Sequence, residues 1–253
     1  MLWLLTCVTT AVLLIIVVMI RDMAKLPTTA KTTALSGSAS AAPSGGSGPT
    51  RDEIVPKRAK PSPSRSGSRS ASRPASGPQV TDTASGLSYE LLPLPWQRGC
   101  PGVLDSPMFS WDAGEHAVAG QADIGGTEVD WHGNACSGQL QQAFAYSGPA
   151  DVGPVATGVA DAVGQAYYAG LPHSRTVEDS YGTTVSGHPA WVVKFLMTYP
   201  DAAGQGLAWS TELGAVVVVD LGAGHAPAVF YVSVPSNLGT ENVGALIGSL
   251  QVI

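Results

Sequence analysis

The sequence predicts an α+β domain, a mostly antiparallel sheet covered by helices, which follows one transmembrane helix and a disordered stalk. Three observations support this: an uncharged apolar N-terminus, a long Ser/Pro/Gly/Arg-rich stretch after it, and alternating apolar and polar residues near the C-terminus. We place the anchor at residues 1–20, the linker at 21–85 and the globular domain at 86–253. A chain that is globular throughout is excluded, because the linker has no aromatic residue and few aliphatic ones with which to form a core.

The N-terminal segment is long enough to cross a bilayer. Residues 2–20 carry no charge, and as a helix they would extend for about 28 Å, close to the hydrocarbon core of about 30 Å. A cleaved signal peptide is the alternative, but the apolar run is longer than usual and no charged segment precedes it. We therefore expect a single-pass protein that contacts the lipid bilayer through residues 2–20.

Two features of the sequence favour opposite sides of the membrane for the domain. Arg21, Lys25 and Lys31 follow the span, and the positive-inside rule would keep that end in the cytoplasm. The Ser/Thr/Ala/Gly/Pro stalk and a pair of domain cysteines are more typical of an extracytoplasmic protein. We expect a plasma-membrane protein with its C-terminal domain outside, and the inward orientation stays open.

The linker is low-complexity sequence with a basic charge. It includes SGSASAAPSGGSGP at 36–49 and SPSRSGSRSASRP at 62–74, and it holds ten Lys or Arg against four Asp or Glu. We interpret Arg65, Arg69 and Arg73 as solvated spacer charge. Nucleic-acid binding is not expected, because residues 86–253 hold three Lys or Arg against fifteen Asp or Glu and would repel phosphate.

The first half of the domain is expected to form short strands and one helix. The strands are placed by apolar segments around residues 90–94, 108–111, 116–122 and 127–131, with a turn over 123–126. The helix starts with Asp151 as its cap and Pro154 in its first turn, and it stops at Gly170. Its apolar face is formed by Val155, Val159, Val163 and Ala166.

The last third shows the clearest periodicity. Residues 190–199 alternate, which places Trp191, Val193, Phe195, Met197 and Tyr199 on one face of a strand. Val216 to Val219 form the β-branched run of a central strand that is covered on both faces. Another strand is expected at 227–234.

A helix is expected to close the chain. It starts at Ser236 or Thr240. Its apolar stripe, with helical spacing, consists of Val243, Leu246, Ile247 and Leu250. This stripe must cover one face of the sheet, which completes the α+β sandwich.

The order of these elements resembles the PsbP-like fold. The resemblance rests on the frame Ser186-Gly187-His188-Pro189-Ala190-Trp191, a strand that ends in Val234-Pro235, and a helix that ends in Gly248-Ser249-Leu250. The sequence also resembles surface-tethered actinobacterial envelope proteins of the alanine-proline-rich antigen type. The resemblance implies a non-enzymatic binding or accessory domain, and it supplies no catalytic residue.

Cys100 and Cys136 are the only cysteines of the domain. We predict a disulfide between them, which would suit an extracytoplasmic domain whose first half has few large apolar residues. The four-residue spacing of His132 and Cys136, with His116 and Cys100 near in sequence, is a weak signal for zinc because no Cys-x-x-Cys or His-Glu-x-x-His motif accompanies it. We expect no metal and no cofactor.

An acidic cluster offers the alternative of catalysis. Asp112, Glu115, Glu128 and Asp130 lie close in sequence, and a pair of carboxyl groups is what a glycoside hydrolase requires. Solvated acidic turns are the simpler interpretation. Glu212 precedes the Val run, and its position near a strand end predicts that it is exposed.

Five aromatic residues are candidates for a carbohydrate or peptide groove, because their rings suit half-exposed surfaces. They are Trp96, Trp111, Trp131, Tyr167 and Tyr168. Core packing is expected for most of them.

The sequence thus favours a membrane-anchored, non-enzymatic envelope domain that binds or assists another envelope component, either a protein or a polymer. The alternatives are an envelope hydrolase that uses the acidic cluster and an inward-facing regulatory domain on a membrane tether. No catalytic residue is assigned.

Overall fold

The computed structural model describes residues 77–101 and 104–253. The predicted anchor at 2–20 and nearly all of the linker at 21–85 lie outside this part of the chain. Within the two described ranges, no helix is long and apolar enough to cross a membrane.

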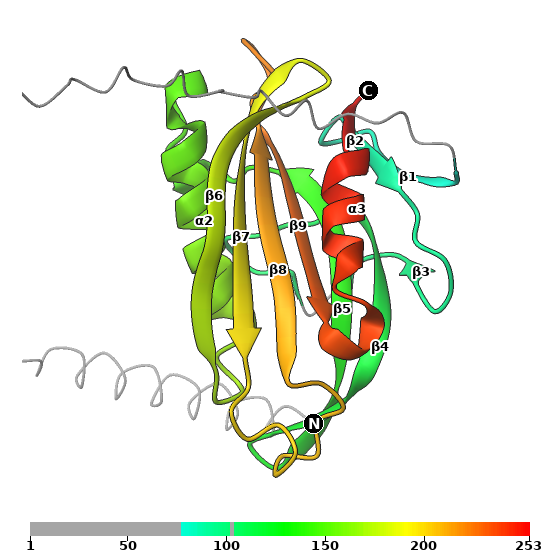
Figure 1. The fold of residues 1–253 in the computed structure, drawn as a ribbon. Coiled ribbons are helices and arrows are strands. Elements are labelled where there is room, and N and C mark those ends of the chain that lie inside the picture. Colours follow the sequence, from blue (N-terminus) through cyan, green and yellow to red (C-terminus); the bar gives the residue numbers. More distant parts are fainter. Residues whose placement is uncertain (1–76, 102–103) are drawn as a thin grey trace, which may run out of the picture. The chain divides into compact units, whose positions relative to one another are not determined.

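The domain is built on a seven-stranded sheet in which all neighbouring strands are antiparallel. The order is β3-β4-β5-β9-β8-β7-β6, and the strands are seen nearly side by side in Figure 1. Their bounds are β3 Gln97–Arg98, β4 Ala113–Ile124, β5 Thr127–Gln139, β6 Ser174–Val185, β7 His188–Thr198, β8 Thr211–Val219 and β9 Ala228–Pro235.

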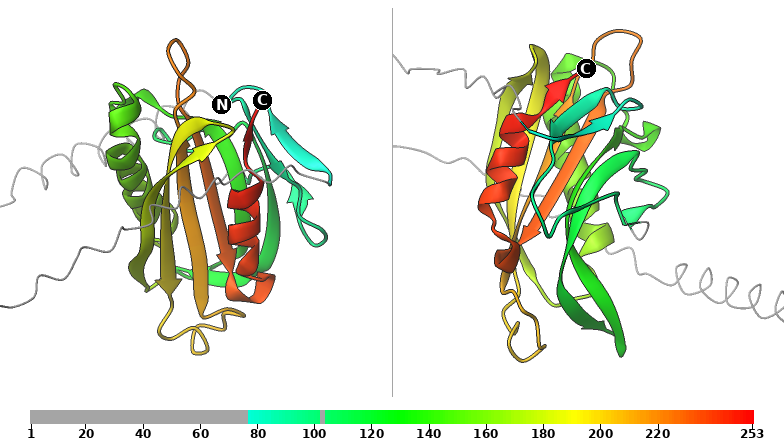
Figure 2. Two further views of the ribbon diagram at one scale, coloured as in Figure 1. Left: turned by 45° about the horizontal axis from the view of Figure 1, so that its top comes forward. Right: turned by 90° about the vertical axis from the view of Figure 1, so that its right-hand side faces the viewer.

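Helices cover both faces of this sheet. Helix α2 (Val152–Tyr167) packs on β7 and β8 from one side, and α3 (Glu241–Ser249) packs on the other side, as the side view in Figure 2 shows. A second sheet lies on the α3 side and consists of β1 (Gln79–Asp82), β2 (Leu87–Glu90) and β10 (Gln251–Val252). Short 3₁₀ turns occur at Gln142–Phe144, Pro149–Asp151 and Ser236–Leu238.

The central strand β8 has the two-sided burial that its sequence predicted. Val216 and Val218 belong to the core under α2, whereas Val217 and Val219 belong to the core under α3. All four are fully buried. The alternation in β7 is confirmed as well, since Val193, Phe195, Met197 and Tyr199 are buried in the α2 core and Trp191 packs against it. The stripe of α3 is buried in the opposite core.

Three sequence predictions are corrected by the structure, and one strand was missed. Strand β1 lies inside the range assigned to the linker, so the folded domain begins by Gln79 rather than at residue 86. Residues 108–111 form no strand, only an isolated bridge between Ser106 and Phe109. Residues 90–94 lie largely beyond β2, which ends at Glu90. Strand β6 was not predicted, because it lies at the sheet edge with mostly exposed polar side chains.

The start of α2 also differs from the prediction. Asp151 occupies the N-cap position, but its carboxylate accepts hydrogen bonds from the Ser147 backbone N–H and hydroxyl rather than from the helix. The helix ends at Tyr167, three residues before Gly170. The predicted disulfide is present: Cys100 and Cys136 are bonded, with Cα atoms 6.0 Å apart.

Candidate functional site

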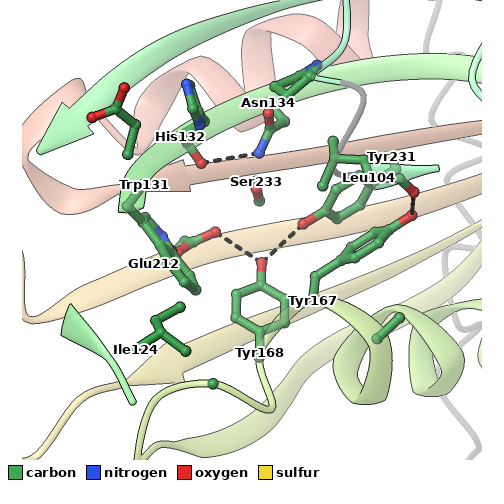
Figure 3. Close-up of a pocket in the computed structure, with 14 residues that line it drawn as sticks. Leu104, Ile124, Trp131, His132, Asn134, Tyr167, Tyr168, Glu212, Tyr231 and Ser233 are labelled. Carbon is green, nitrogen blue, oxygen red and sulfur yellow. Dashed lines mark hydrogen bonds between the residues drawn. The ribbon is translucent and has the colours of Figure 1, made fainter. Parts of the chain in front are cut away.

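A cavity of about 260 Å³ opens where β5, β8 and β9 meet the C-terminal end of α2 (Figure 3). Apolar, aromatic and polar side chains share its wall, which is formed by Pro101, Leu104, Ile124, Asp130, Trp131, His132, Asn134, Ala166, Tyr167, Tyr168, Gly170, Glu212, Tyr231 and Ser233.

The strand register brings the polar residues of the wall together. Asn134 on β5 lies directly opposite Ser233 on β9, so their side chains are cross-strand neighbours on one face. Glu212 on β8 shares this face, because it is two residues from Gly214, which lies opposite Ser233. Tyr231 precedes Ser233 by two residues and also points to this face.

A β-bulge shapes the rim. Strand β4 has an extra residue between Val118 and Gly120, opposite His132 and Trp131. Neighbouring residues in a regular strand point to opposite faces, and a bulge re-aims side chains. Beside this bulge both Trp131 and His132 line the cavity.

Glu212 places a buried carboxyl group in the cavity wall. It is 1% exposed, and its carboxyl group accepts hydrogen bonds from Trp131 Nε1 (2.8 Å), Tyr168 Oη (2.8 Å) and Tyr199 Oη (3.1 Å). Burial raises the pKa of Glu212, and these hydrogen bonds oppose the shift only in part. No Lys or Arg is among the cavity-lining residues of the described chain, so this carboxyl group has no cationic partner in the wall.

Two tyrosines extend the Glu212 group into a hydrogen-bonded chain. The Tyr168 hydroxyl lies between Glu212 Oε1 and the Tyr231 hydroxyl, which is 3.0 Å away. Burial, together with the nearby Glu212, raises the pKa of both tyrosines well above the usual value. Both are therefore neutral hydroxyl groups that can donate and accept.

Two buried polar atoms in the wall lack a hydrogen-bond partner among the described residues. They are Asn134 Oδ1 and Ser233 Oγ, on residues that are 5% and 0% exposed. The amide orientation of Asn134 is set by Nδ2, which donates to the His132 carbonyl at 2.9 Å. Ser233 lies close enough to Glu212 to lower its pKa, although its hydroxyl makes no well-directed bond. Buried polar groups are nearly always satisfied in native proteins, so these atoms are available to a molecule in the cavity.

His132 and Asp130 border the same cavity. Burial and the neighbouring His116 ring, whose centroid is 5.3 Å away, lower the pKa of His132. Its imidazole is therefore neutral at neutral pH. Asp130 is exposed and adds negative charge at the rim.

The acidic cluster proposed from the sequence is not gathered in the cavity. Only Asp130 lines it, while Asp112 and Glu128 are exposed outside it. Glu115 is fully buried, and its carboxylate accepts a hydrogen bond from the Leu92 backbone N–H at 2.9 Å. Glu212, predicted to be exposed, is buried instead, because Trp131, Tyr168 and Tyr199 enclose it.

Three of the five candidate aromatic residues line the cavity, namely Trp131, Tyr167 and Tyr168. Trp96 is buried in the core on the α3 side. Trp111 stacks on Phe109, and its Nε1 donates a hydrogen bond to the Tyr167 hydroxyl at 3.0 Å. Trp111 therefore contacts a residue of the cavity wall without lining the cavity itself.

Sequence reasoning missed Asn134, Ser233 and Tyr231. A signal existed for two of them: Tyr231 and Ser233 are polar-tipped residues two positions apart in an otherwise apolar strand, which places them on one face. The two cysteines near His132 are engaged in the disulfide. Across residues 77–101 and 104–253, no three His, Cys, Asp or Glu side chains are grouped so that they could hold a metal ion.

Comparison with known proteins yields a likeness in fold. No protein-family model matches the sequence, and no curated protein matches it. Among solved structures, the domain is similar to the solution structure of cyanobacterial PsbP from Synechocystis sp. PCC 6803, with a TM-score of 0.44 and 11% sequence identity over 69% of this chain and 93% of that chain. The likeness agrees with the PsbP-like fold predicted from the sequence and carries no inference about what the domain binds.

Proposed function

We propose that the chain is a non-enzymatic binding protein whose domain takes a small organic molecule into the cavity beside Glu212. The observation that carries this proposal is the pair of buried atoms, Asn134 Oδ1 and Ser233 Oγ, that make no hydrogen bond among the described residues and belong to side chains lining one cavity. Apolar walls with a few convergent polar groups are the usual composition of a small-molecule site.

The sequence adds a location to this proposal. The predicted anchor at 2–20 and stalk at 21–85 would hold the domain at the outer side of the plasma membrane. The ligand would then be a component of the cell envelope, or a molecule that another envelope protein receives from this domain. Protease shaving of intact cells tests the orientation, and protection of the domain would favour the inward-facing alternative.

Binding accounts for the geometry better than the hydrolase alternative does. A hydrolase built on the acidic cluster needs two of its carboxyl groups at one site, and only Asp130 reaches the cavity. The other carboxyl group in the wall, that of Glu212, is held by three hydrogen-bond donors and is suited to recognition.

The test is a binding screen with the full chain in lipid nanodiscs. Small neutral, cationic and anionic organic molecules are screened by saturation-transfer NMR, and each hit is measured again with Ala166→Trp, which fills the cavity mouth. Gln165→Trp is the matched control, because Gln165 is an exposed residue on the same helical turn that does not line the cavity. We expect hits that Ala166→Trp abolishes and Gln165→Trp retains. A screen without such hits would refute the proposal.

A further inference from the structure

The cavity wall contains hydrogen-bond acceptors that a bound molecule could use. An ionised carboxylate can accept about four hydrogen bonds, and Glu212 receives three from the protein. Asn134 Oδ1 is an acceptor only, and Ser233 Oγ can also accept. The side chains of Asn134 and Ser233 are direct cross-strand neighbours, which places their Cβ atoms about 5 Å apart.

The charges around the cavity favour a cation. Glu212 and Asp130 are its acidic residues, and neither Lys nor Arg lines it in the described part of the chain. The domain as a whole, residues 86–253, holds three Lys or Arg against fifteen Asp or Glu, so its field concentrates small cations and repels anions. A buried carboxylate is stable only when it is paired or fully hydrogen-bonded, and the position facing the cavity is where a partner can reach Glu212.

We propose that the ligand carries a primary ammonium group, which binds among Glu212, Asn134 Oδ1 and Ser233 Oγ. An ammonium group has three N–H donors, and the wall offers three acceptor positions for them. The organic part of the ligand packs against Trp131, Tyr167 and the apolar side chains of the wall (Figure 3). This inference rests on the proposed function and names its ligand class.

Binding of an ammonium group is coupled to a proton. Trp131 from β5, Tyr168 after α2, Tyr199 after β7 and Ser233 and Tyr231 from β9 face Glu212, and none of them is a cation. Burial raises the pKa of Glu212, so below this pKa the ammonium group must displace the carboxyl proton. Affinity then rises with pH by about tenfold per unit until Glu212 is ionised in the free protein, and is constant above that point until the ammonium group of the ligand loses its proton, at about pH 10.

His132 is a second cavity residue whose protonation can contribute to this dependence. Asp130 at the rim also faces the cavity. Protonation of His132 at low pH would repel a cation and would change affinity in the same direction as Glu212. The variant His132→Gln separates the two, because the dependence due to Glu212 persists in it.

The experiment uses three probes of similar shape and different charge. Binding of 2-phenylethylammonium, 2-phenylethanol and 3-phenylpropanoate to the full chain in nanodiscs is measured by isothermal titration calorimetry. A fourth probe, the N-trimethyl derivative of the amine, keeps the charge but has no N–H donor. We expect the primary ammonium probe to bind at least about tenfold more tightly than each of the others.

Two pairs of variants identify the groups involved. Glu212→Gln removes the charge, with Glu115→Gln as its control at a buried carboxyl group outside the cavity. Ser233→Ala removes an unpartnered hydroxyl, with Ser88→Ala as its control at another buried, unpartnered hydroxyl. The cavity variants should weaken the ammonium probe, Glu212→Gln by about tenfold or more, while the controls leave its affinity unchanged. Ser233→Ala keeps the test decisive if Glu212→Gln does not fold.

The outcomes separate this inference from the proposed function. Equal or tighter binding of the alcohol or the carboxylate in the cavity overturns the ammonium inference and leaves a small-molecule site. Displacement of the ammonium probe by potassium at constant ionic strength overturns it in favour of an alkali-metal site. If no molecule of any charge binds in a way that Ala166→Trp abolishes, both proposals fail.

Discussion

Glu115 provides a pH-dependent cost to folding that a single substitution should remove. Its side chain is 0% exposed, and one carboxyl oxygen, Oε1, has no hydrogen-bond partner in the described structure. Burial raises the pKa of Glu115 from 4.5 to about 7, and the Leu92 N–H and Arg98 oppose this only in part. Because the folded state holds the proton more tightly than the unfolded state, the contribution of Glu115 to stability falls as pH rises through this interval.

The size of the effect follows from the shift. Each pKa unit corresponds to 1.36 kcal/mol, so ionised Glu115 costs the folded state at most about 3 kcal/mol above pH 7. Glu115→Gln keeps an acceptor for the Leu92 N–H and cannot ionise. The variant should therefore be more stable than the unmodified protein by up to about 3 kcal/mol near pH 8, and nearly equal to it near pH 4.

Urea unfolding of both proteins at several pH values measures this difference. Other groups also titrate, but they contribute equally to the two proteins, so only the difference between the curves is interpreted. A difference that is constant with pH would refute the reasoning, because it would mean that Glu115 does not change its ionisation in the folded state. If Glu115→Gln instead became less stable than the unmodified protein as pH rises, the result would show that the Glu115 carboxylate is favourably paired.

Further substitutions test the packing and the cross-link. Cys100→Ser combined with Cys136→Ser opens a loop of 36-residue separation, and should lower the free energy of unfolding by about 4 kcal/mol in denaturant titrations; no loss would show that the bond does not form. Gly114→Ala would place Cβ 2.1 Å from Cys100 Sγ and 2.6 Å from the Ala135 carbonyl oxygen, so we expect a loss of about 3 kcal/mol, with free thiols detectable by alkylation. Gly158→Ala is its counterpart, because nothing lies within 4 Å of that Cβ and the helix should gain about 1 kcal/mol. Phe230→Ala removes a fully buried ring whose centroid is 4.8 Å from that of Tyr89, and a melting measurement should reveal a loss of about 3 to 5 kcal/mol; a loss below about 1 kcal/mol would contradict the packing.

The elements that sequence analysis predicted are those with strong periodicity. Strands β7, β8 and β9 and helix α3 bury whole faces, so their apolar residues recur with the period of the element. Strand β6 gives no such signal, because it pairs on one side only, with β7, and exposes most of its side chains. Strand β1 is four residues long and follows the polar linker sequence, so composition assigned it to the linker.

The site was predictable only in part, for a physical reason. Trp131, Tyr167 and Tyr168 were named as candidates because large aromatic residues with polar tips suit binding surfaces. The burial of Glu212 depends on Trp131, Tyr168 and Tyr199. Trp131 and Tyr168 are distant from Glu212 in sequence: the sheet brings Trp131 on β5 close to it, and the packing of α2 on β7 and β8 brings Tyr168 close to it. Such contacts cannot be predicted from the residues that neighbour each position in the sequence. The pairing of Asn134 with Ser233 likewise follows from the β5–β9 register, which periodicity does not determine.

The indole N–H of Trp131 reports directly on the Glu212 cavity, because it donates to the Glu212 carboxyl group. Its ¹H–¹⁵N NMR signal, assigned with Trp131→Phe, can be followed while 2-phenylethylammonium is added to the full chain in nanodiscs. We predict a saturable shift of this signal that is lost in Ala166→Trp and retained in Gln165→Trp. A Trp131 signal that stays in place while the probe binds elsewhere, or while nothing binds, would contradict the assignment of this cavity as the binding site.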